Sequence, residues 1–334
     1  MAESLPTNTR LTYDAIGIRE DLSNIIYNIS PMDTPFVNGC GRGSCDNTLF
    51  EWQTDELATP AANRQLEGDD YASTAATEPR RLTNHTQISA AQVQSSGTAE
   101  AVDFAGRKST QAYQLAKRAK EMKRDMEQML LDGTAKVAGG AGAARESASF
   151  ATWVGTNVIG TTPIVAASTG LGLVNNGAAG YPDGTTSSLG GGANTAVSLS
   201  LINEVVGRIW DLGGSPDTIL CRSDVKQTIS SAAVGGSVVA DPVGNTSGSK
   251  PITAVNAVDV MVTDFGTFKV VPDRFLPAGN CDFIDFDLWS VDYLRPFRTE
   301  TLAKSGDSVK QLLIAEYGLR AKNGLGSGML KSAI

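Results

Sequence analysis

The sequence is poor in the residues on which most enzyme chemistry depends. It has one histidine, His85, and four cysteines in 334 residues, and its aromatic content is only 6%. One histidine and scattered cysteines do not build the usual zinc sites, and a hydrolytic triad would have to use His85, although no G-x-S-x-G nucleophile motif accompanies it. So few cysteines in so long a chain favour free thiols in a reducing compartment. The sequence therefore predicts no catalytic, cofactor or metal site.

The sequence also lacks the signatures of membrane and nucleic-acid binding. No apolar run approaches the roughly 18 residues of a transmembrane helix, and the N-terminus lacks the basic-then-apolar order of a signal peptide. The formal net charge of −8, from 36 acids and 28 bases, argues against a surface that grips nucleic acid or anionic lipid. The first lysine of the chain is Lys108, so arginine is the only base of the first third.

Three aspartates near residue 285 resemble calcium ligands only superficially. Asp282, Asp285 and Asp287 lie within six residues of the chain, but the loop glycine and terminal glutamate of a calcium-binding loop are missing. We expect them to be solvent-facing carboxylates on a strand.

Residues 46–98 contain two extended segments joined by a long polar stretch. Residues 47–54 alternate, which places Phe50 and Trp52 on one face of a strand. A second, strongly polar extended run covers residues 81–93. The acidic, proline-containing residues 55–79 between them have too few apolar groups to offset the cost of ordering their backbone. We predict two antiparallel arms whose tip either docks on a neighbouring molecule or is a mobile loop.

The clearest helix covers residues 107–132. Its apolar residues recur every three or four positions, and Gly133 is placed to end it. We expect the pairs Lys117–Glu121 and Lys123–Glu127 on its solvent side, where they stabilise a helix by a few tenths of a kcal/mol each. Its surplus of bases fits a solvated, salt-bridged face better than a nucleic-acid face.

The rest of the sequence predicts a mixture of helices and strands. Helices are expected at 18–29, 198–212 and 223–230, and strands at 217–221, 257–263, 267–271, 281–294 and 308–319. Because an extended arm, a long helix, a mixed middle and a β-rich end do not alternate as βαβ units, the predicted fold class is α+β.

This order of elements resembles the major capsid proteins of tailed bacteriophages with the Hong Kong 97-type fold. The segments that carry the resemblance are IREDLSNIIYNISPMDTPF, NTLFEWQTDEL, EGDD, ILCRSDVKQTIS, FKVVPDRFLPAG and LLIAEYGLRAKN, which together cover nearly the whole chain. The resemblance implies an N-terminal arm at 1–45, an extended loop at 46–100, and a peripheral domain with a spine helix at 101–144. It further implies an axial domain at 145–280 and peripheral-domain strands at 281–334.

The resemblance also implies a structural function. The chain is expected to assemble into pentamers and hexamers that form an icosahedral shell around double-stranded DNA, as part of a virion assembled in the host cytoplasm. Expected partners are further copies of the chain, a separate scaffolding protein, a portal and a decoration protein. A separate scaffolding protein is expected because only some ten residues precede the arm-like region that begins within residues 1–45. The residues expected to make inter-subunit contacts are Ile25, Tyr27, Phe50, Trp52, Leu57, Leu66 and Tyr71.

Some proteins of this fold join their subunits by an isopeptide bond from a loop lysine. Residues 46–100 contain no lysine, so we expect a non-covalent shell. An encapsulin-like nanocompartment that encloses cargo protein is the main alternative, and a hydrolase or a tail-tube component is a more distant one. The substitution Trp52→Ala is expected to reduce particle yield more than subunit stability.

Overall fold

The computed structural model describes residues 33–55, 57, 62–65, 67–68, 70, 78–104, 106–154, 158–159, 182–185, 197–233, 239–240, 254–255 and 259–331. The helix expected at 18–29 lies outside these residues. In the described part of the chain no helix is long and apolar enough to cross a membrane.

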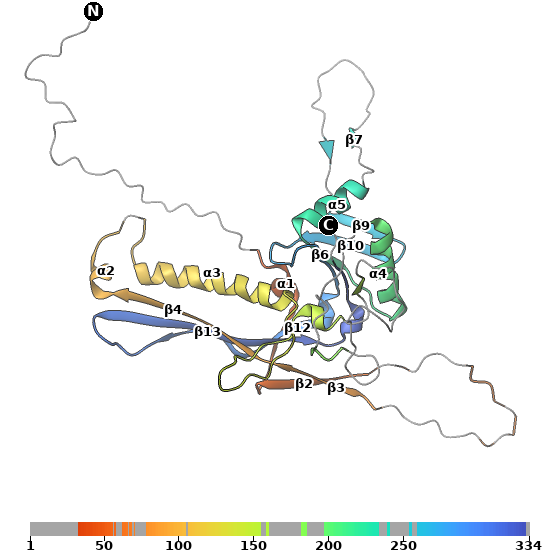
Figure 1. Cartoon of the computed structure of the whole chain (residues 1–334), viewed down its shortest axis with the longest axis horizontal. Helices are drawn as coiled ribbons and strands as arrows, with labels where there is room; N and C mark the ends of the chain where they lie inside the picture. Colours follow the sequence, from red (N-terminus) through yellow and green to blue (C-terminus); the bar gives the residue numbers. More distant parts are fainter. Residues whose placement is uncertain are drawn as a thin grey trace, which may run out of the picture.

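An elongated lobe forms one half of the molecule (Figure 1). Its long helix, α3 (Thr110–Leu131), packs along a four-stranded sheet of order β1-β12-β13-β4. The strands are β1 (Gly41–Ser44), β4 (Gln87–Ser96), β12 (Trp289–Thr301) and β13 (Ser308–Ala321). The short elements beside them are α1 (Pro35–Gly39), α2 (Gly97–Ala101) and the 3-10 turn η2 (Phe150–Thr152).

The second lobe is built on a six-stranded sheet of order β5-β14-β11-β6-β10-β9. Its strands are β5 (Val158–Ile159), β6 (Thr218–Cys221), β9 (Val260–Thr263), β10 (Gly266–Pro272), β11 (Cys281–Ile284) and β14 (Gly328–Leu330). Helices α4 (Leu199–Asp211) and α5 (Ser223–Ala233) share a buried core with this sheet. The remaining elements are β7 (Val239–Ala240), β8 (Ala254–Val255), η4 (Phe286–Leu288) and η5 (Gly324–Gly326).

The topology confirms the α+β class. The six-stranded sheet mixes parallel pairs, such as β6 with β10, and antiparallel pairs, such as β6 with β11. Strands β11 and β14 come from the last 54 residues but belong to this sheet, whereas β12 and β13 belong to the elongated lobe. The chain therefore crosses between the two lobes more than once near its end.

The two expected arms are a β-hairpin base formed by β2 (Leu49–Thr54) and β3 (Arg80–His85), which pair antiparallel as predicted. The expectation of one continuous strand at 81–93 was wrong, because the chain changes partner at Thr86. Before that residue it pairs with β2, and after it β4 pairs with β13. The backbone N–H of Thr86 donates to the carbonyl of Thr48 (2.9 Å), which fixes the bend.

Helix α3 has the predicted position, although it begins three residues later than expected, at Thr110. The hydroxyl of Ser109 accepts a hydrogen bond from the N–H of Ala112, which caps the first turn, and Gly133 has a φ of +88° just past the last turn. The Lys117–Glu121 pair is present at 3.9 Å. The expected Lys123–Glu127 pair was wrong, because Glu127 is fully buried beneath α1.

The strand expected at 281–294 is interrupted. Asp285 accepts a hydrogen bond from the N–H of Asp287 (3.1 Å), and the resulting 3-10 turn η4 separates β11 from β12. Asp282 is not solvent-facing as expected, because β11 lies inside the six-stranded sheet and buries it. That burial raises the pKa of its carboxyl well above the usual range.

Candidate assembly surface and the residues that support it

The root of the arm is attached to its own chain by aromatic packing. Phe50 is 5% exposed, and its ring stacks on Trp52 with a centroid separation of 5.7 Å. Trp52, which is half-buried, packs in turn against Trp153 at 5.3 Å. A Cβ atom at Gly318 would lie 2.5 Å from the Phe50 ring, so glycine is required for this close approach. Phe50 and Trp52 therefore pack against the core of their own subunit.

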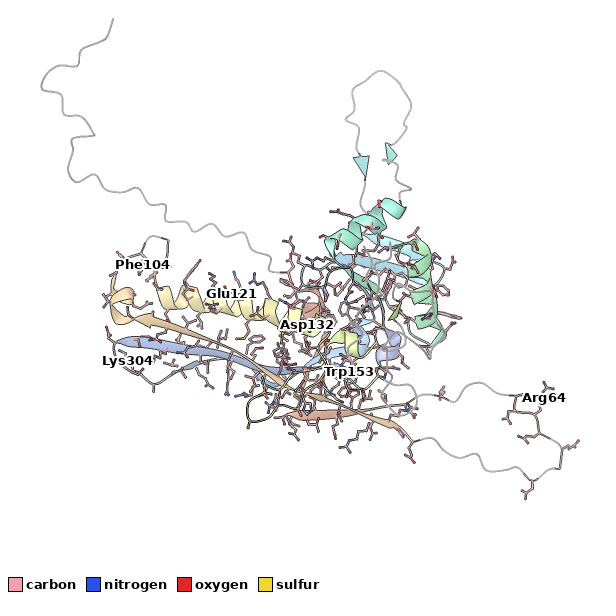
Figure 2. All side chains as sticks on the ribbon, viewed as in Figure 1. Arg64, Phe104, Glu121, Asp132, Trp153 and Lys304 are labelled. Atoms are coloured by element: carbon pink, nitrogen blue, oxygen red, sulfur yellow. The ribbon has the colours of Figure 1, made fainter. Side chains whose placement is uncertain are left out.

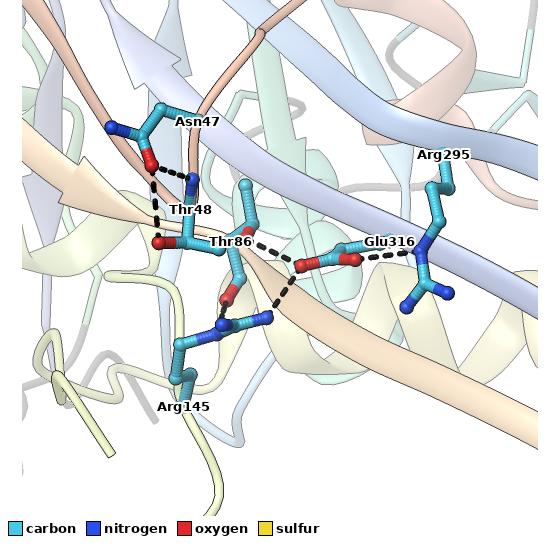
Figure 3. Close-up of polar contacts among 6 residues, drawn as sticks. All are labelled: Asn47, Thr48, Thr86, Arg145, Arg295 and Glu316. Atoms are coloured by element: carbon cyan, nitrogen blue, oxygen red, sulfur yellow. Dashed lines mark hydrogen bonds and ion pairs between the residues drawn. The ribbon is translucent and has the colours of Figure 1, made fainter. Parts of the chain in front are cut away.

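A buried carboxylate lies where the arm joins the elongated lobe (Figure 3). Glu316 on β13 is 3% exposed, and its Oε1 accepts from Arg145 (2.5 Å) and from the hydroxyl of Thr86 (2.9 Å). Its Oε2 accepts from Nε of Arg295 on β12 (2.8 Å). Arg145 also donates to the carbonyl of Thr86 (3.3 Å). One acidic side chain thus connects two strands of the sheet to the bend between β3 and β4.

Asn84 forms a second buried connection at the same place. Its amide group donates to the carbonyl of Leu319 (2.6 Å) and to the hydroxyl of Ser147 (3.1 Å). Its side-chain oxygen accepts from the N–H of Ala148 (2.9 Å). Because Asn84 is completely buried, these contacts hold β3 rigidly on the sheet.

Glu127 attaches α1 to the long helix. Its two oxygens accept from the N–H groups of Phe36 (2.7 Å) and Val37 (2.8 Å). Burial raises the pKa of Glu127 to about 8, and the neighbouring charge of Asp273 adds to the increase, while the two N–H groups oppose it. Burial likewise raises the pKa of Asp273. Two ionised carboxylates repel each other in a buried site, so we expect the pair to hold one proton in the folded state.

The seven residues expected to contact neighbouring subunits have different positions. Phe50 and Trp52 pack inside their own subunit, whereas Leu57, just beyond the end of β2, is 96% exposed. Arg64, further along the arm, lies at the far end of the molecule from α3 (Figure 2). The other four residues lie outside the described part of the chain: Ile25, Tyr27, Leu66 and Tyr71.

His85 lies at the end of β3, opposite Leu49. Burial and the positive charges of Lys136 and Arg145 lower its pKa. All four cysteines are free and buried, which agrees with the expected free thiols. Burial raises the pKa of the Cys221 thiol to about 12 and that of Cys45 to about 11.

Sequence reasoning missed the buried polar residues that attach the arm. Glu316 lies within the otherwise apolar segment LLIAEYGL, whereas Glu127 lies at a position that the helix pattern assigns to the solvent side. An acid at a position that the pattern assigns to the core is a detectable signal, because such a group is buried only with partners. Asn84 gave no such signal, since its neighbours in the sequence are polar.

Comparison with known proteins identifies the chain. The profile of the SU10 major capsid protein family matches residues 5–333. The chain belongs to this family. The major capsid protein of Escherichia phage Phieco32 is 30% identical over 340 aligned residues, which cover 97% of this chain and 96% of that protein. The chain is therefore a phage major capsid protein, a structural component of the virion capsid.

Solved structures confirm the fold of this capsid protein. The capsid protein of cyanophage A-1(L) superposes with a TM-score of 0.68 at 12% identity, over 95% of this chain and 97% of that one. The SrpI encapsulin of Synechococcus elongatus PCC 7942 superposes with a TM-score of 0.50 at 9% identity, over 92% of each chain. The capsid protein thus has the expected Hong Kong 97-type fold, which it shares with an encapsulin.

Proposed function

We propose that copies of this capsid protein form pentamers and hexamers that close an icosahedral shell around packaged double-stranded DNA. The observation that carries the proposal is the match of the capsid family to almost the entire chain. The anchored root and the exposed Leu57 support it, because a rigid base can present a long segment to a neighbour. The predicted domain ranges, 1–45, 46–100, 101–144, 145–280 and 281–334, are part of this proposal.

We assign the inter-subunit contacts to the arm and the N-terminal segment. Among the candidates that the structure describes, Leu57 has a side chain that is almost fully exposed. Leu66, Tyr71, Ile25 and Tyr27 are proposed to act with it on the adjacent copy. Phe50 and Trp52 are proposed to contribute by holding the root in place. The remaining proposed partners are a scaffolding protein, a portal and a decoration protein, and assembly is proposed to occur in the host cytoplasm.

Electron microscopy of the purified protein tests the proposal directly. Closed shells are expected for the wild-type chain, and Leu57→Asp is expected to reduce their yield without changing the thermal unfolding of dilute subunits. Leu57→Met, which keeps an apolar side chain of similar size, is the matched control. Equal yields for Leu57→Asp and wild type would remove Leu57 from the interface, and the absence of any shells even in the presence of the proposed scaffolding protein would refute the proposed function.

An encapsulin-like nanocompartment is the second candidate, because an encapsulin shares the fold. The contents of the shells distinguish the two functions. Nuclease-protected DNA in particles from infected cells supports a capsid, whereas a stoichiometric cargo protein without DNA supports a nanocompartment. The family match favours the capsid.

A further inference from the structure

The solvent side of α3 carries a line of four bases. Lys117, Lys120 and Lys123 are exposed, and Arg124 is half-buried. Because each of them lies three or four residues from another, they share one side of the helix over about 10 Å of its length. We call these four residues the basic stripe. Its positive charge contrasts with the net charge of −8 of the whole chain.

The subunit itself neutralises little of the basic stripe. The expected Lys123–Glu127 pair is absent, because both oxygens of Glu127 accept from N–H groups of α1. Glu121 is shared between Lys117 at 3.9 Å and Arg118 at 2.7 Å. Among the described residues no ion pair involves the other three bases of the stripe. The salt-bridged side that the sequence favoured for this helix is therefore only partly formed.

The chemistry of this side of α3 suits a nucleic acid better than a protein. None of the exposed large apolar side chains of the described residues belongs to α3. Protein–protein interfaces bury apolar side chains at their centre, whereas protein–DNA interfaces are polar and positively charged. Asp125, the only exposed acid of α3, follows Arg124 and therefore points about 100° away from it around the helix. The stripe is thus a polar, positively charged line.

We propose that the basic stripe of α3 contacts the phosphate backbone of packaged double-stranded DNA. The proposal rests on the proposed function and adds to it the surface that faces the DNA. Duplex DNA carries one negative charge per about 1.7 Å of its axis, so a line of bases about 10 Å long meets several phosphates whatever the base sequence. Because the chain is acidic overall, a contact confined to this stripe positions the DNA without holding it tightly.

Binding of a short DNA duplex to dilute subunits tests the contact. Each phosphate that a base neutralises adds about 0.9 to the steepness with which log K falls against log salt concentration. Lys120→Gln/Lys123→Gln is therefore expected to make this slope shallower by about 2 and to weaken binding at low salt by about tenfold. Thermal unfolding verifies that the variant folds.

Lys269→Gln/Lys304→Gln is the matched control for this measurement. Both lysines are exposed, and their replacement gives the same change of net charge. Lys269 lies on β10 in the other lobe, and Lys304 lies between β12 and β13, on the sheet side of the elongated lobe (Figure 2). The control is expected to bind the duplex with the salt dependence of the wild type.

Cross-linking tests the same contact inside the assembled shell. Formaldehyde treatment of DNA-filled particles from infected cells, followed by nuclease digestion and mass spectrometry, is expected to find nucleotides attached to Lys117, Lys120 or Lys123. An unchanged salt slope in Lys120→Gln/Lys123→Gln, or cross-links that leave out all three lysines, would overturn the contact, while DNA-filled shells would still support the proposed function.

An acidic protein surface is the competing occupant of the stripe. Wild-type affinity of Lys120→Gln/Lys123→Gln for the duplex, together with a loss of shells, would assign the stripe to such a surface and overturn the proposal. Particles from infected cells that hold no nuclease-protected DNA would refute both the contact and the proposed function.

Discussion

The Glu127–Asp273 pair gives the subunit a specific dependence of stability on pH. In the folded state the pKa of Glu127 is raised from 4.5 to about 8, and that of Asp273 is raised above 3.8. The folded protein therefore keeps a proton that the unfolded chain has already lost once the pH exceeds about 4.5. The free energy of unfolding must therefore fall as the pH rises from about 4.5 to about 8, and the contribution of the bound proton is lost by about pH 8.

The size of the effect follows from the number of protons. One additional bound proton lowers the free energy of unfolding by about 1.4 kcal/mol per pH unit, or about 3 kcal/mol between pH 5.5 and 7.5. Asp282 and Asp292 are also buried acids with raised pKa values, so the total slope of the wild type is steeper than that of the pair alone. A substitution in the pair is needed to measure how much the pair contributes to the slope.

Asp273→Asn is that substitution. The substitution removes the charge of Asp273 and offers Glu127 an amide donor, so the slope is expected to decrease by up to about 1.4 kcal/mol per pH unit, while burial continues to raise the pKa of Glu127. Urea unfolding of dilute subunits at pH 5.5, 6.5 and 7.5 measures the slope. Asp259→Asn is the control, because Asp259 is exposed, pairs with Lys226 at 2.8 Å and has a lowered pKa that leaves it ionised over this range. An unchanged slope in Asp273→Asn would refute the shared proton.

Three further outcomes are expected. Glu316→Gln should lower the free energy of unfolding in urea by about 3 kcal/mol, because Arg145 loses its buried ionic partner; a loss below about 1 kcal/mol would contradict this. Gly318→Ala should cost about 1–3 kcal/mol, since its Cβ would clash with Phe50; Phe50→Leu in the same chain should recover part of it, and no recovery would exclude the clash. Shells boiled in denaturant with reductant should give only the 34.9 kDa monomer on a gel, because residues 46–100 contain no lysine; a ladder of oligomers would disprove a non-covalent shell.

Periodicity in the sequence was sufficient to predict the helices and strands that bury a regular apolar face. Helix α3 was predicted within three residues at each end, because its stripe, its serine cap and its terminal glycine all agree. Strand β13 and helix α4 were predicted for the same reason. The alternation in 47–54 correctly placed Phe50 and Trp52 on one face of β2.

Predictions failed where a single polar contact decides the local structure. Thr86 divides the expected strand, and nothing in the polar run RLTNHTQ shows that its hydroxyl meets Glu316, which lies 230 residues away. Glu127 was assigned to solvent by its spacing from Lys123, because the pairing rule for helices takes no account of a second segment covering the helix. Such errors arise from long-range contacts, which a local pattern does not contain.

The buried contacts of Asn84 and Glu316 determine where the rigid base of the arm ends. Ordering a long polar arm costs backbone entropy that its own few apolar groups do not repay. Asn84 and Glu316 confine that cost to the segment beyond Thr54, since they fix the base of the arm on the sheet within each subunit. A fixed base also limits the directions available to the residues that follow it, which reduces the entropy lost when they contact another copy. Weakening the base should therefore impair assembly even where no residue of the interface has changed.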